Sequence, residues 1–389
     1  MRVVFVSNYL NHHQLPLALA LHGAENVEFT FIATKEITEY RKNLGYKEYN
    51  LLYDFVLCSY LSEKNFQKAL SLCDECDVLI YGIAPKELIR NRLNSNKLTF
   101  RYSERIYKEK PCPWYEILPR AIKYRQLYGK NPNLYLLCAS AYTASDYAKT
   151  KTFLNKAYKW GYFTETKRYG DIDALISEKK RHSILWAGRL MGSKHPEVTI
   201  AIAKRLKKEG YAFTLNIIGT GEMEEALKQE IQKEHLTDCV HLLGSMPPEE
   251  VREHMEKSEI FLFTSDRNEG WGAVLNEAMN SACALVASHA IGSVPFLIED
   301  NQNGYIYRDG DLNDLFYKVK QLFDHDEERR RLSKEAYTTI IEEWNPENAA
   351  QHLLLLANNL LSDTPVPNLF KKGVCSKAML LADDWYEHK

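Results

Sequence analysis

The sequence predicts an α/β protein built from two doubly wound, Rossmann-like domains. Three observations lead to this prediction. The chain has 389 residues, which is more than one hydrophobic core typically holds. Short runs of β-branched and aromatic residues alternate with amphipathic segments, and this alternation occurs on both sides of a charged stretch at residues 163–183. Strict alternation of strands and helices is typical of parallel sheets that are covered by helices on both faces.

The first half opens with the apolar run RVVFVS, which we expect to be a strand. This run is too short for the apolar core of a signal peptide. Further strands are expected where similar runs end in a turn signal or a helix start. The elements expected in this half are strands at residues 2–7, 27–34, 77–82, 98–103 and 133–140, and helices around residues 15–21 and 64–73.

The second half repeats the pattern and ends in a long helix, which is expected to start after Asn345 and Pro346 because Asn caps helices and Pro suits their first turn. The apolar tail after this helix should dock onto the body of the protein. We expect a first domain of residues 1–170, with the helix and tail of residues 346–389 packing back on it, and a second domain of residues 171–345. The strands expected in the second half are residues 183–189, 213–219, 240–245, 260–265, 284–288 and 303–307, separated by helices such as 195–210 and 224–235.

Composition narrows the classes of function. The chain is 45% hydrophobic and 26% charged, as globular proteins are, and its net charge of -2 gives no general attraction to nucleic acid. The sequence contains no run of about 18 apolar residues, which is the length that a helix needs to cross a bilayer. The eight cysteines lie mostly inside apolar runs, which indicates a reduced, cytoplasmic protein. Cys73 and Cys76 lack a second pair at zinc-site spacing, so a structural role is favoured over a metal or redox role.

The stretch NEGWGAVLNEAMN, residues 268–280, points to a ligand. It follows an apolar strand, and the helix expected to begin within it should direct its first backbone amides at an anion. Glu269 lies in the loop before this helix, and Glu277 lies about 7 Å along it at 1.5 Å per residue. Carboxylates bind hydroxyls and repel phosphate, so this order fits a sugar joined through a diphosphate to a ribose. The amides expected at the anion are those of Gly272, Ala273 and Val274.

Two acids beside a diphosphate need cations nearby, and the loop after the strand at residues 183–189 supplies them. Arg189 and Lys194 are five residues apart at the same expected edge of the sheet. Arg offers forked donors to phosphate oxygens, and Lys acts as a point charge. Two glycine turns after further strands belong to the same edge, although GTG alone lacks the full dinucleotide fingerprint. These turns contain Gly219 in IGTGEMEEAL, and Ser245 with Met246 in LLGSMPPEEV.

Four stretches of the second half resemble, in their order and spacing, the carboxy-terminal half of family 4 glycosyltransferases. They are GRLMGSKHPEVTIAIAKRL, IIGTGEMEEAL, LLGSMPPEEV and TSDRNEGWGAVLNEAMNSACALVAS. The resemblance covers residues 183–345, and SNYLNHHQLPLALAL resembles the first strand and helix of relatives that build bacterial surface polysaccharides. It implies the GT-B fold, in which two Rossmann-like domains face each other across a cleft, and retaining transfer from a nucleotide sugar. It implies that Glu269 holds the donor sugar and that Glu277 holds the ribose. The other implied donor contacts are Gly270, Trp271 and Gly272 at the sugar and phosphate, Arg189 and Lys194 at the diphosphate, and the backbone of Ser245 and Met246 at the base.

The first domain departs from these relatives at two places. Asn11, His12 and His13 replace a paired-glycine loop, and two interpretations stay open for the histidines: helix capping and packing, or contact with an acceptor or phosphate. Where many relatives have a His after a middle strand, this chain has Glu104 and Arg105. Two interpretations stay open for these residues: they form an ion pair at the surface, or they contribute to binding of the acceptor.

We expect neither a metal ion nor another cofactor. Asp171 and Asp173 have the D-x-D spacing of metal-dependent glycosyltransferases, but they lie in the expected linker and follow no strand, so a linker role is favoured. In the family picture, Arg and Lys carry the charge of the leaving group.

Two interpretations stay open for the region of the first domain that would face the acceptor. The stretch FRYSERIYKEKPCPWYEILPRAIKYRQLYGKNP interleaves Arg and Lys with Tyr and Trp. Such a face either rests on an anionic membrane and admits a lipid-linked acceptor, or covers the first domain as a solvated helix. In the first case, a cytoplasmic protein would bind the inner face of the membrane.

The expected function is transfer of a hexose, with retention, from a nucleotide-diphosphate sugar to a saccharide or a lipid-linked saccharide, with UDP as the expected nucleotide. One alternative is a GT-B sugar-nucleotide epimerase or hydrolase, which would turn over the donor without an acceptor. Another is a non-catalytic homologue that acts as a scaffold, which would have lost its phosphate-facing cation or its paired acids. Arg189, Lys194, Glu269 and Glu277 are all present.

Overall fold

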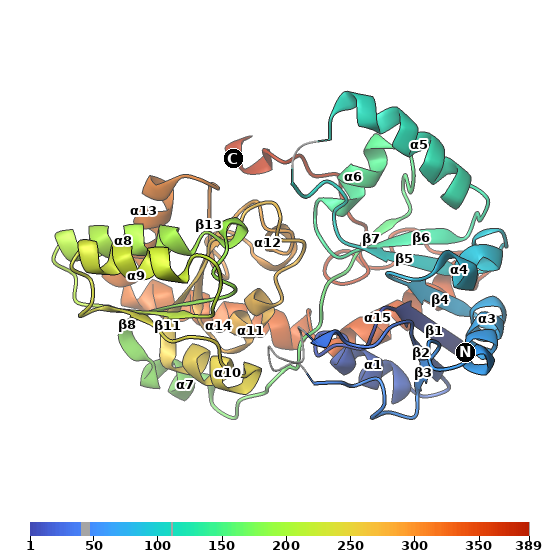
Figure 1. Cartoon of the computed structure of the whole chain (residues 1–389), viewed down its shortest axis with the longest axis horizontal. Helices are drawn as coiled ribbons and strands as arrows, with labels where there is room; N and C mark the ends of the chain where they lie inside the picture. The colour runs from blue at the N-terminus through green and yellow to red at the C-terminus, as the bar shows by residue number, and fades with distance from the viewer. Residues whose placement is uncertain (40–46, 110–111, 389) are drawn as a thin grey trace. The chain divides into compact units, whose positions relative to one another are not determined.

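The computed structural model describes residues 1–39, 47–109 and 112–388, and the chain divides into two compact units (Figure 1). Unit 1 comprises Met1–Glu165 and Trp344–Ala382, and unit 2 comprises Thr166–Glu343 and Asp383–Lys389. Each unit is built on one wholly parallel sheet with helices packed against it. The predicted fold class, two Rossmann-like α/β domains, is confirmed.

Unit 1 has a seven-stranded sheet in the order β3-β2-β1-β4-β5-β6-β7, so its first strand lies inside the sheet. Its strands are β1 (Arg2–Ser7), β2 (Glu28–Ala33), β3 (Val56–Cys58), β4 (Val78–Tyr81), β5 (Thr99–Ser103), β6 (Leu134–Cys138) and β7 (Ala157–Lys159). Its helices are α1 (Leu15–His22), α3 (Glu63–Glu75), α4 (Lys86–Leu93), α5 (Trp114–Tyr128), α6 (Thr143–Lys149) and α15 (Pro346–Leu361).

Alternation along β1 builds the core of unit 1 on both faces of the sheet. Val4 and Val6 pack with Ala69 of α3 and Leu88 of α4 in one buried cluster. On the other face, α1 and α15 lie side by side (Figure 1). The C-terminal helix therefore packs on the first domain, as the sequence predicts.

The segment after α15 covers an edge of this sheet. The amide of Lys159 in β7 donates to the carbonyl of Ser376 at 2.8 Å, and the amide of Cys375 donates to the carbonyl of Lys159 at 2.9 Å. These bonds occupy backbone groups that an edge strand would otherwise present to solvent.

Unit 2 has a six-stranded sheet in the order β10-β9-β8-β11-β12-β13. Its strands are β8 (Lys180–Ala187), β9 (Thr214–Ile218), β10 (Val240–Leu242), β11 (Ser258–Phe263), β12 (Ala284–Ser288) and β13 (Tyr305–Tyr307). Its helices are α7 (Ile172–Glu178), α8 (Pro196–Lys208), α9 (Glu224–Lys233), α10 (Pro248–Lys257), α11 (Val274–Asn280), α12 (Val294–Leu297), α13 (Leu312–Asp324) and α14 (Asp326–Glu342), with short 3-10 turns at Gly192–Lys194 and Trp385–His388.

A buried lysine ties together the segments that enter and leave the centre of this sheet. The Lys179 ammonium donates to the carbonyls of Met255, Ser258 and Ser281 at 2.8, 2.9 and 2.9 Å. Burial lowers the pKa of Lys179, yet each carbonyl favours the charged donor. Lys179 thereby links the end of α10, the start of β11 and the turn after α11.

The structure differs from the sequence-based expectations in its short strands and in the grouping of its C-terminal residues. The strands β3 and β7 were not predicted, although two other strands of three residues, β10 and β13, were. The unit boundaries lie within a few residues of those expected, but Asp383–Lys389 groups with unit 2 rather than with the first domain. There the Tyr386 hydroxyl donates to the carbonyl of Ile306 at 2.5 Å, and Asp383 pairs with Arg267 at 3.3 Å. Among the described residues, no helix is long and apolar enough to cross a bilayer.

Replacing Lys179 with Met should destabilise unit 2 by on the order of 3 kcal/mol, because buried carbonyls would lose their donor. Differential scanning calorimetry should show a lower melting temperature for the transition of this unit. Lys180→Met is the matched control, since Lys180 is the exposed neighbour. Equal melting temperatures for the two variants would contradict the role assigned to Lys179.

Candidate functional site

Four loops of unit 2 meet at one edge of its sheet, because parallel strands deliver their carboxyl ends to the same side. The loops after β8 and β9 approach so closely that only glycine fits at two positions. A Cβ on Gly219 would lie 1.8 Å from the carbonyl oxygen of Gly188, and one on Gly221 would lie 2.3 Å from that of Leu190. The GTG sequence therefore brings two loops into contact, and Gly219 supports the site through its backbone.

The turn that carries Lys194 is fixed from below by Thr264, which directly follows β11. The Thr264 hydroxyl donates to the carbonyl of Lys194 at 2.7 Å and accepts from the indole of Trp186 at 2.9 Å. The amide of Asp266 also donates to the carbonyl of Ser193 at 3.1 Å. The β8 and β11 loops therefore form one hydrogen-bonded unit.

Glu269 forms an ion pair with Lys194, so the structure brings together two of the residues that the sequence predicts as functional. The Ser265 hydroxyl donates to the same carboxylate oxygen at 3.1 Å. The backbone of Glu269 is also held, since its amide donates to the carbonyl of Asp266 at 3.0 Å and its carbonyl accepts from the amide of Gly292 at 3.2 Å. A half-buried carboxylate with a cation and a hydroxyl beside it can accept hydrogen bonds from ligand hydroxyls.

Gly272 makes the turn into α11. Its φ of +84° is left-handed, and a Cβ there would lie 2.3 Å from Cζ of Phe263. The helix begins at Val274, with Ala273 as its cap, and it is shorter than the sequence predicts. Gly272, Ala273 and Val274 thus form the entry to α11, as expected.

Trp271 is a core residue. Its side chain is fully buried, and its indole donates to Oδ1 of Asn276 at 2.9 Å. In the segment that contains Gly270 and Gly272, Trp271 can therefore offer a ligand only its backbone. The sequence motif by itself does not show whether this Trp packs in the core or contacts a ligand with its side chain.

Glu277 lies in the first turn of α11 and is half-buried. Burial raises the pKa of its carboxyl group to about 7, and the nearby Arg252 opposes this rise. Arg252 itself is oriented by a hydrogen bond to Oδ1 of Asn280 at 2.8 Å. Glu277 therefore changes its charge near neutral pH, unlike an ordinary surface Glu.

Arg189, Ser245 and Met246 lie on the other loops of this edge. Arg189 is exposed, and no carboxylate within the described ranges pairs with it. Ser245 is exposed and Met246 is half-buried, just after Gly244, whose carbonyl accepts from the amide of Gly219 at 2.8 Å. These residues leave a cation and a short polar backbone segment accessible to a ligand.

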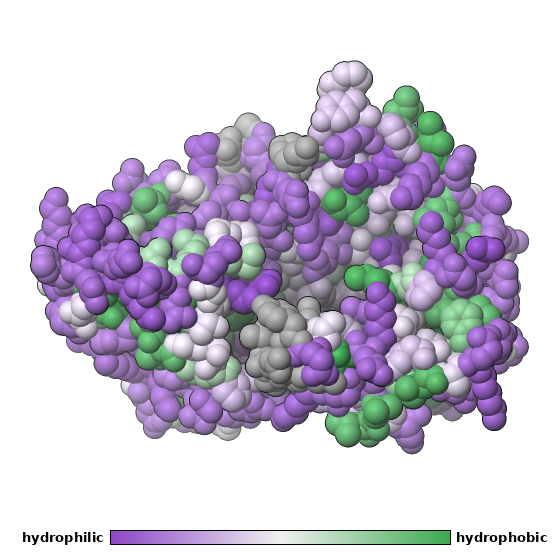
Figure 2. Space-filling model, viewed as in Figure 1, coloured by the Kyte–Doolittle hydropathy of each residue, from purple (hydrophilic) through white to green (hydrophobic). Residues whose placement is uncertain are grey.

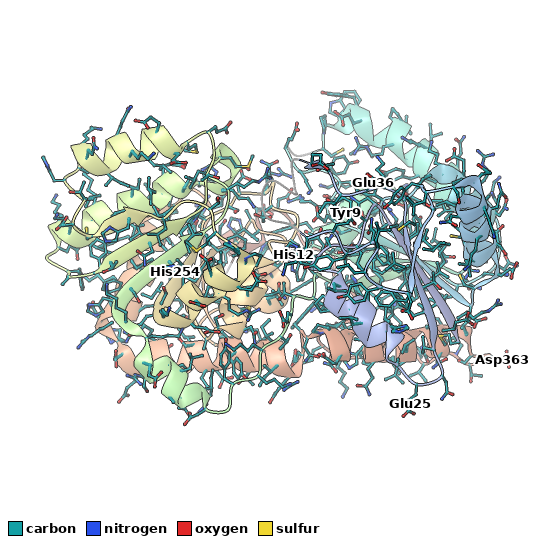
Figure 3. The ribbon with its side chains drawn as sticks, turned by 60° about the horizontal axis from the view of Figure 1, so that its bottom comes forward. Tyr9, His12, Glu25, Glu36, His254 and Asp363 are labelled. Atoms are coloured by element: carbon teal, nitrogen blue, oxygen red, sulfur yellow. The ribbon has the colours of Figure 1, made fainter. Side chains whose placement is uncertain are left out.

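In unit 1, the loop between β1 and α1 holds Asn11, His12 and His13 (Figure 3). Oδ1 of Asn11 accepts from the amides of His13 and Gln14 at 3.0 and 3.1 Å, so Asn11 shapes the start of the helix. The ring of His13 stacks on Tyr162, with centroids 5.8 Å apart and planes at 15°. Asn11 thus forms a turn before α1, whose N-cap is Gln14 without a side-chain cap bond, and His13 has a packing contact on the strand-end side of the sheet.

Glu104 is the polar centre of this edge of unit 1. Its carboxylate accepts from the Tyr162 hydroxyl at 2.5 Å and pairs with Lys108. Burial raises the pKa of Tyr162, with Tyr102 and Glu104 adding to the effect, so Tyr162 remains a hydroxyl donor. Sequence reasoning missed Tyr162 because it follows β7, a strand that was not predicted.

Arg105 and the D-x-D acids have structural partners. Arg105 is buried against Asp146, with Nε 3.6 Å from Oδ2, so Glu104 and Arg105 do not form a surface pair with each other. Asp171 caps α7 by accepting from the amide of Ala174 at 2.9 Å, and Asp173 pairs with Lys334 at 2.7 Å. Both acids therefore have structural contacts, but they belong to α7 of unit 2, so the expectation of a linker at this place is wrong.

Comparison with known proteins identifies the domain in unit 2. Residues 171–339 match the family described as glycosyl transferases group 1. Over 137 residues the chain is 36% identical to the amylovoran biosynthesis glycosyltransferase AmsK of Erwinia amylovora, which covers 34% of this chain and 33% of that protein. Over 172 residues it is 27% identical to the poly(ribitol-phosphate) alpha-N-acetylglucosaminyltransferase of Staphylococcus aureus, covering 44% of this chain and 34% of that protein. The matches span about a third of each relative, and they show that this chain contains a glycosyl transferases group 1 domain.

The fold of the chain is GT-B. The structure is similar to that of Anabaena HepE, solved in complex with UDP, with a TM-score of 0.65 and 13% identity over 91% of this chain and 99% of that one. It is also similar to a glycosyltransferase from Rickettsia africae, with a TM-score of 0.64 and 13% identity over 93% of this chain and 99% of that one. At these identities the similarity is one of fold.

Replacing Gly272 with Ala should lower the stability of unit 2 by roughly 1–3 kcal/mol, because Ala would strain a left-handed backbone and its Cβ would collide with Phe263. Thermal unfolding followed by circular dichroism measures the effect. Gly170→Ala is the control, since a Cβ on Gly170 meets nothing within 4 Å. A Gly272→Ala protein as stable as this control would rule out the steric requirement.

Proposed function

We propose that the protein is a retaining hexosyltransferase that uses a nucleotide-diphosphate sugar, with UDP as the nucleotide, and glycosylates a saccharide or lipid-linked saccharide. The Lys194–Glu269 pair carries this proposal, because it combines a hydroxyl-binding carboxylate with a phosphate-binding cation on loops that Thr264 joins. The glycosyl transferases group 1 domain supports it. So do the names of the relatives, which concern bacterial polysaccharide or polymer glycosylation.

The proposed donor roles are those that the resemblance to family 4 glycosyltransferases implies. Glu269 accepts hydrogen bonds from hydroxyls of the donor sugar, and Glu277 accepts from those of the ribose. Lys194 and the exposed Arg189 balance the charge of the diphosphate as it leaves, without a metal ion or another cofactor. The backbone around Gly270 and Gly272 lies against the sugar and phosphate, and the segment at Ser245 and Met246 faces the base.

The acceptor side of the proposal rests on unit 1. Glu104 and His13 both contact Tyr162 at the carboxyl ends of the strands. Together these three residues offer a carboxylate, an imidazole and a phenol, which can form hydrogen bonds with the hydroxyls of a saccharide substrate. In this reaction the departing phosphate oxygen takes the proton of the attacking hydroxyl, so no protein nucleophile is needed.

An epimerase or hydrolase would use the same donor contacts without an acceptor. Incubating the protein with a UDP-sugar alone separates the two classes, because rapid turnover without acceptor would favour the epimerase or hydrolase. A scaffold protein would show neither reaction, although it could still bind the nucleotide.

Replacing Arg189 or Glu269 with Ala should reduce transfer by on the order of 10²-fold or more, because each group acts on charge or hydroxyls of the donor. The assay follows release of the nucleotide diphosphate in the presence of acceptor, with circular dichroism to verify folding. Arg181→Ala is the matched control, since Arg181 is also exposed but lies at the opposite end of β8. Full activity in either site variant would contradict the proposal.

Donor affinity should rise with pH across the pKa of Glu277, which is about 7. The ionised carboxylate is the better acceptor for ribose hydroxyls, and protonation below this pKa removes one acceptor oxygen. Titration calorimetry with a UDP-sugar between pH 6 and 8 measures the trend, since its diphosphate does not titrate there. Glu277→Gln should bind more weakly at pH 8 and with a flat profile, and a wild-type profile without slope would refute this role.

A further inference from the structure

His195 closes the turn that carries Lys194 and directly precedes α8. Its φ of +49° and ψ of +51° are left-handed, a conformation that a Gly would adopt without strain. The carbonyls of Lys194 and His195 both lie within hydrogen-bond distance of the Thr264 hydroxyl, at 2.7 and 3.1 Å. The backbone of this turn is therefore fixed, and the imidazole is what distinguishes His195 from a simple turn residue.

The imidazole of His195 lies between two carboxylates from different elements. Nδ1 is 2.8 Å from Oε1 of Glu197 in the first turn of α8, and Nε2 is 3.5 Å from Oδ2 of Asp266 in the loop after β11. An ionised carboxylate only accepts hydrogen bonds, and a neutral imidazole has one N–H, so it can donate to one of these acids at a time. The imidazolium has an N–H at both nitrogens, and it is therefore the form that satisfies both acids.

The charges around the ring favour the same form. The hydrogen bond to Glu197 raises the pKa of His195, and the charges of Asp266 and Asp309 add to the rise, while partial burial opposes it. Asp309 lies after β13, and its amide donates to Nδ1 of His289 at 2.9 Å. Because the pKa is raised, the imidazolium is present at lower pH and is lost as the pH rises through that pKa.

The other cations of α8 lie nearer its C-terminal end. Figure 2 shows a mainly hydrophilic surface over α8 and α9. The first cation of α8 is Lys204, which pairs with Glu234 at 2.8 Å. Lys204 is roughly 10 Å along the helix from Glu197 at 1.5 Å per residue. His195 is therefore the cation that pairs with Glu197 at this end of the helix.

Asp266 organises the loop that leads to Glu269. Its carboxylate accepts from the backbone and side-chain amides of Asn268 at 2.8 and 3.2 Å, and its carbonyl accepts from the amide of Glu269 at 3.0 Å. The amide of Asp266 also donates to the turn that carries Lys194. A contact between His195 and Asp266 therefore links the loop of Glu269 to the turn of Lys194.

We propose that His195, as the imidazolium, is a positioning residue that keeps Lys194 and Glu269 in place for transfer by bridging Asp266 and Glu197. The inference deepens the proposed function and rests on it. In this role the ring acts through the two loops rather than on the donor itself. The charge on the diphosphate grows as its bond to the sugar breaks, so a displaced Lys194 slows transfer more than it weakens donor binding.

NMR titration of the His195 ring tests the bridge on the full chain, with His195→Asn to identify its signal. The pKa should lie above the ordinary value of about 6.5, and Asp266→Asn and Glu197→Gln should each lower it. Glu225→Gln is the matched control, because Glu225 is an exposed acid in the first turn of α9, and it should leave the pKa unchanged. A wild-type pKa that is not raised, or one that neither Asp266→Asn nor Glu197→Gln lowers, would overturn the proposal.

Kinetics test the positioning role. His195→Asn and His195→Gly both suit the left-handed backbone, so neither should lower the melting temperature. Each should reduce kcat by roughly 10- to 100-fold and leave KM for the UDP-sugar nearly unchanged. The wild-type kcat should fall at alkaline pH, Glu197→Gln should move this fall to lower pH, and His195→Asn should lack it. A wild-type kcat in His195→Asn, or an alkaline fall that Glu197→Gln does not move, would contradict the role of His195.

The two sets of measurements separate this inference from the proposed function. A wild type that neither binds a UDP-sugar nor transfers its sugar would refute the proposed function, and with it any role of His195 in transfer, even if NMR confirms the bridge. An active wild type whose kcat is unaffected by His195→Asn would refute the positioning role alone.

Discussion

The hydroxyl of Thr264 provides the interaction on which the candidate donor site depends. It joins the carbonyl of Lys194 to the indole of Trp186 through one part-buried and one buried hydrogen bond, and the buried one is worth more in a low-dielectric interior than it would be at the surface. The loop that carries the cation is therefore fixed to the strand that leads to Glu269. The positions of β8 and β11 in the sheet fix the distance between the loops that carry Lys194 and Glu269. Because the two residues already form an ion pair, neither loop has to become ordered when a ligand binds.

The two acids of this edge occupy different environments. Glu269 has a cation and a hydroxyl beside it, whereas burial dominates at Glu277 and raises its pKa to about 7. A ligand with hydroxyls at both ends and a diphosphate between them would contact both acids. The charge of Glu269 is already balanced by Lys194, whereas the carboxylate of Glu277 would be stabilised by hydrogen bonds from the ligand. This difference in environment explains how two carboxylates can serve one polyanionic ligand.

Each unit also contains a buried cation that is satisfied by backbone carbonyls. Arg92 in unit 1 donates to the carbonyls of Cys76 and Leu98, both at 2.7 Å, while Lys179 has the same role in unit 2. A buried cation is costly unless its donors are all used, and here the carbonyls at helix and strand ends use them. Both units thus fix connections around their central strands with the same physical device.

The sequence by itself determined the alternation of strands and helices, the paired sheets and the residues of the β8 and β11 loops, because periodicity and glycine turns are local properties. Tertiary structure decided the rest. It placed Trp271 in the core, gave Arg105 a buried partner in Asp146, and assembled Glu104 with Tyr162, which is 58 residues away along the chain. It also added β3 and β7, which pair with β2 and β6 at the two edges of the sheet of unit 1. These features depend on which segments become neighbours in space, and that information lies in the packing of the whole unit rather than in any one stretch of sequence.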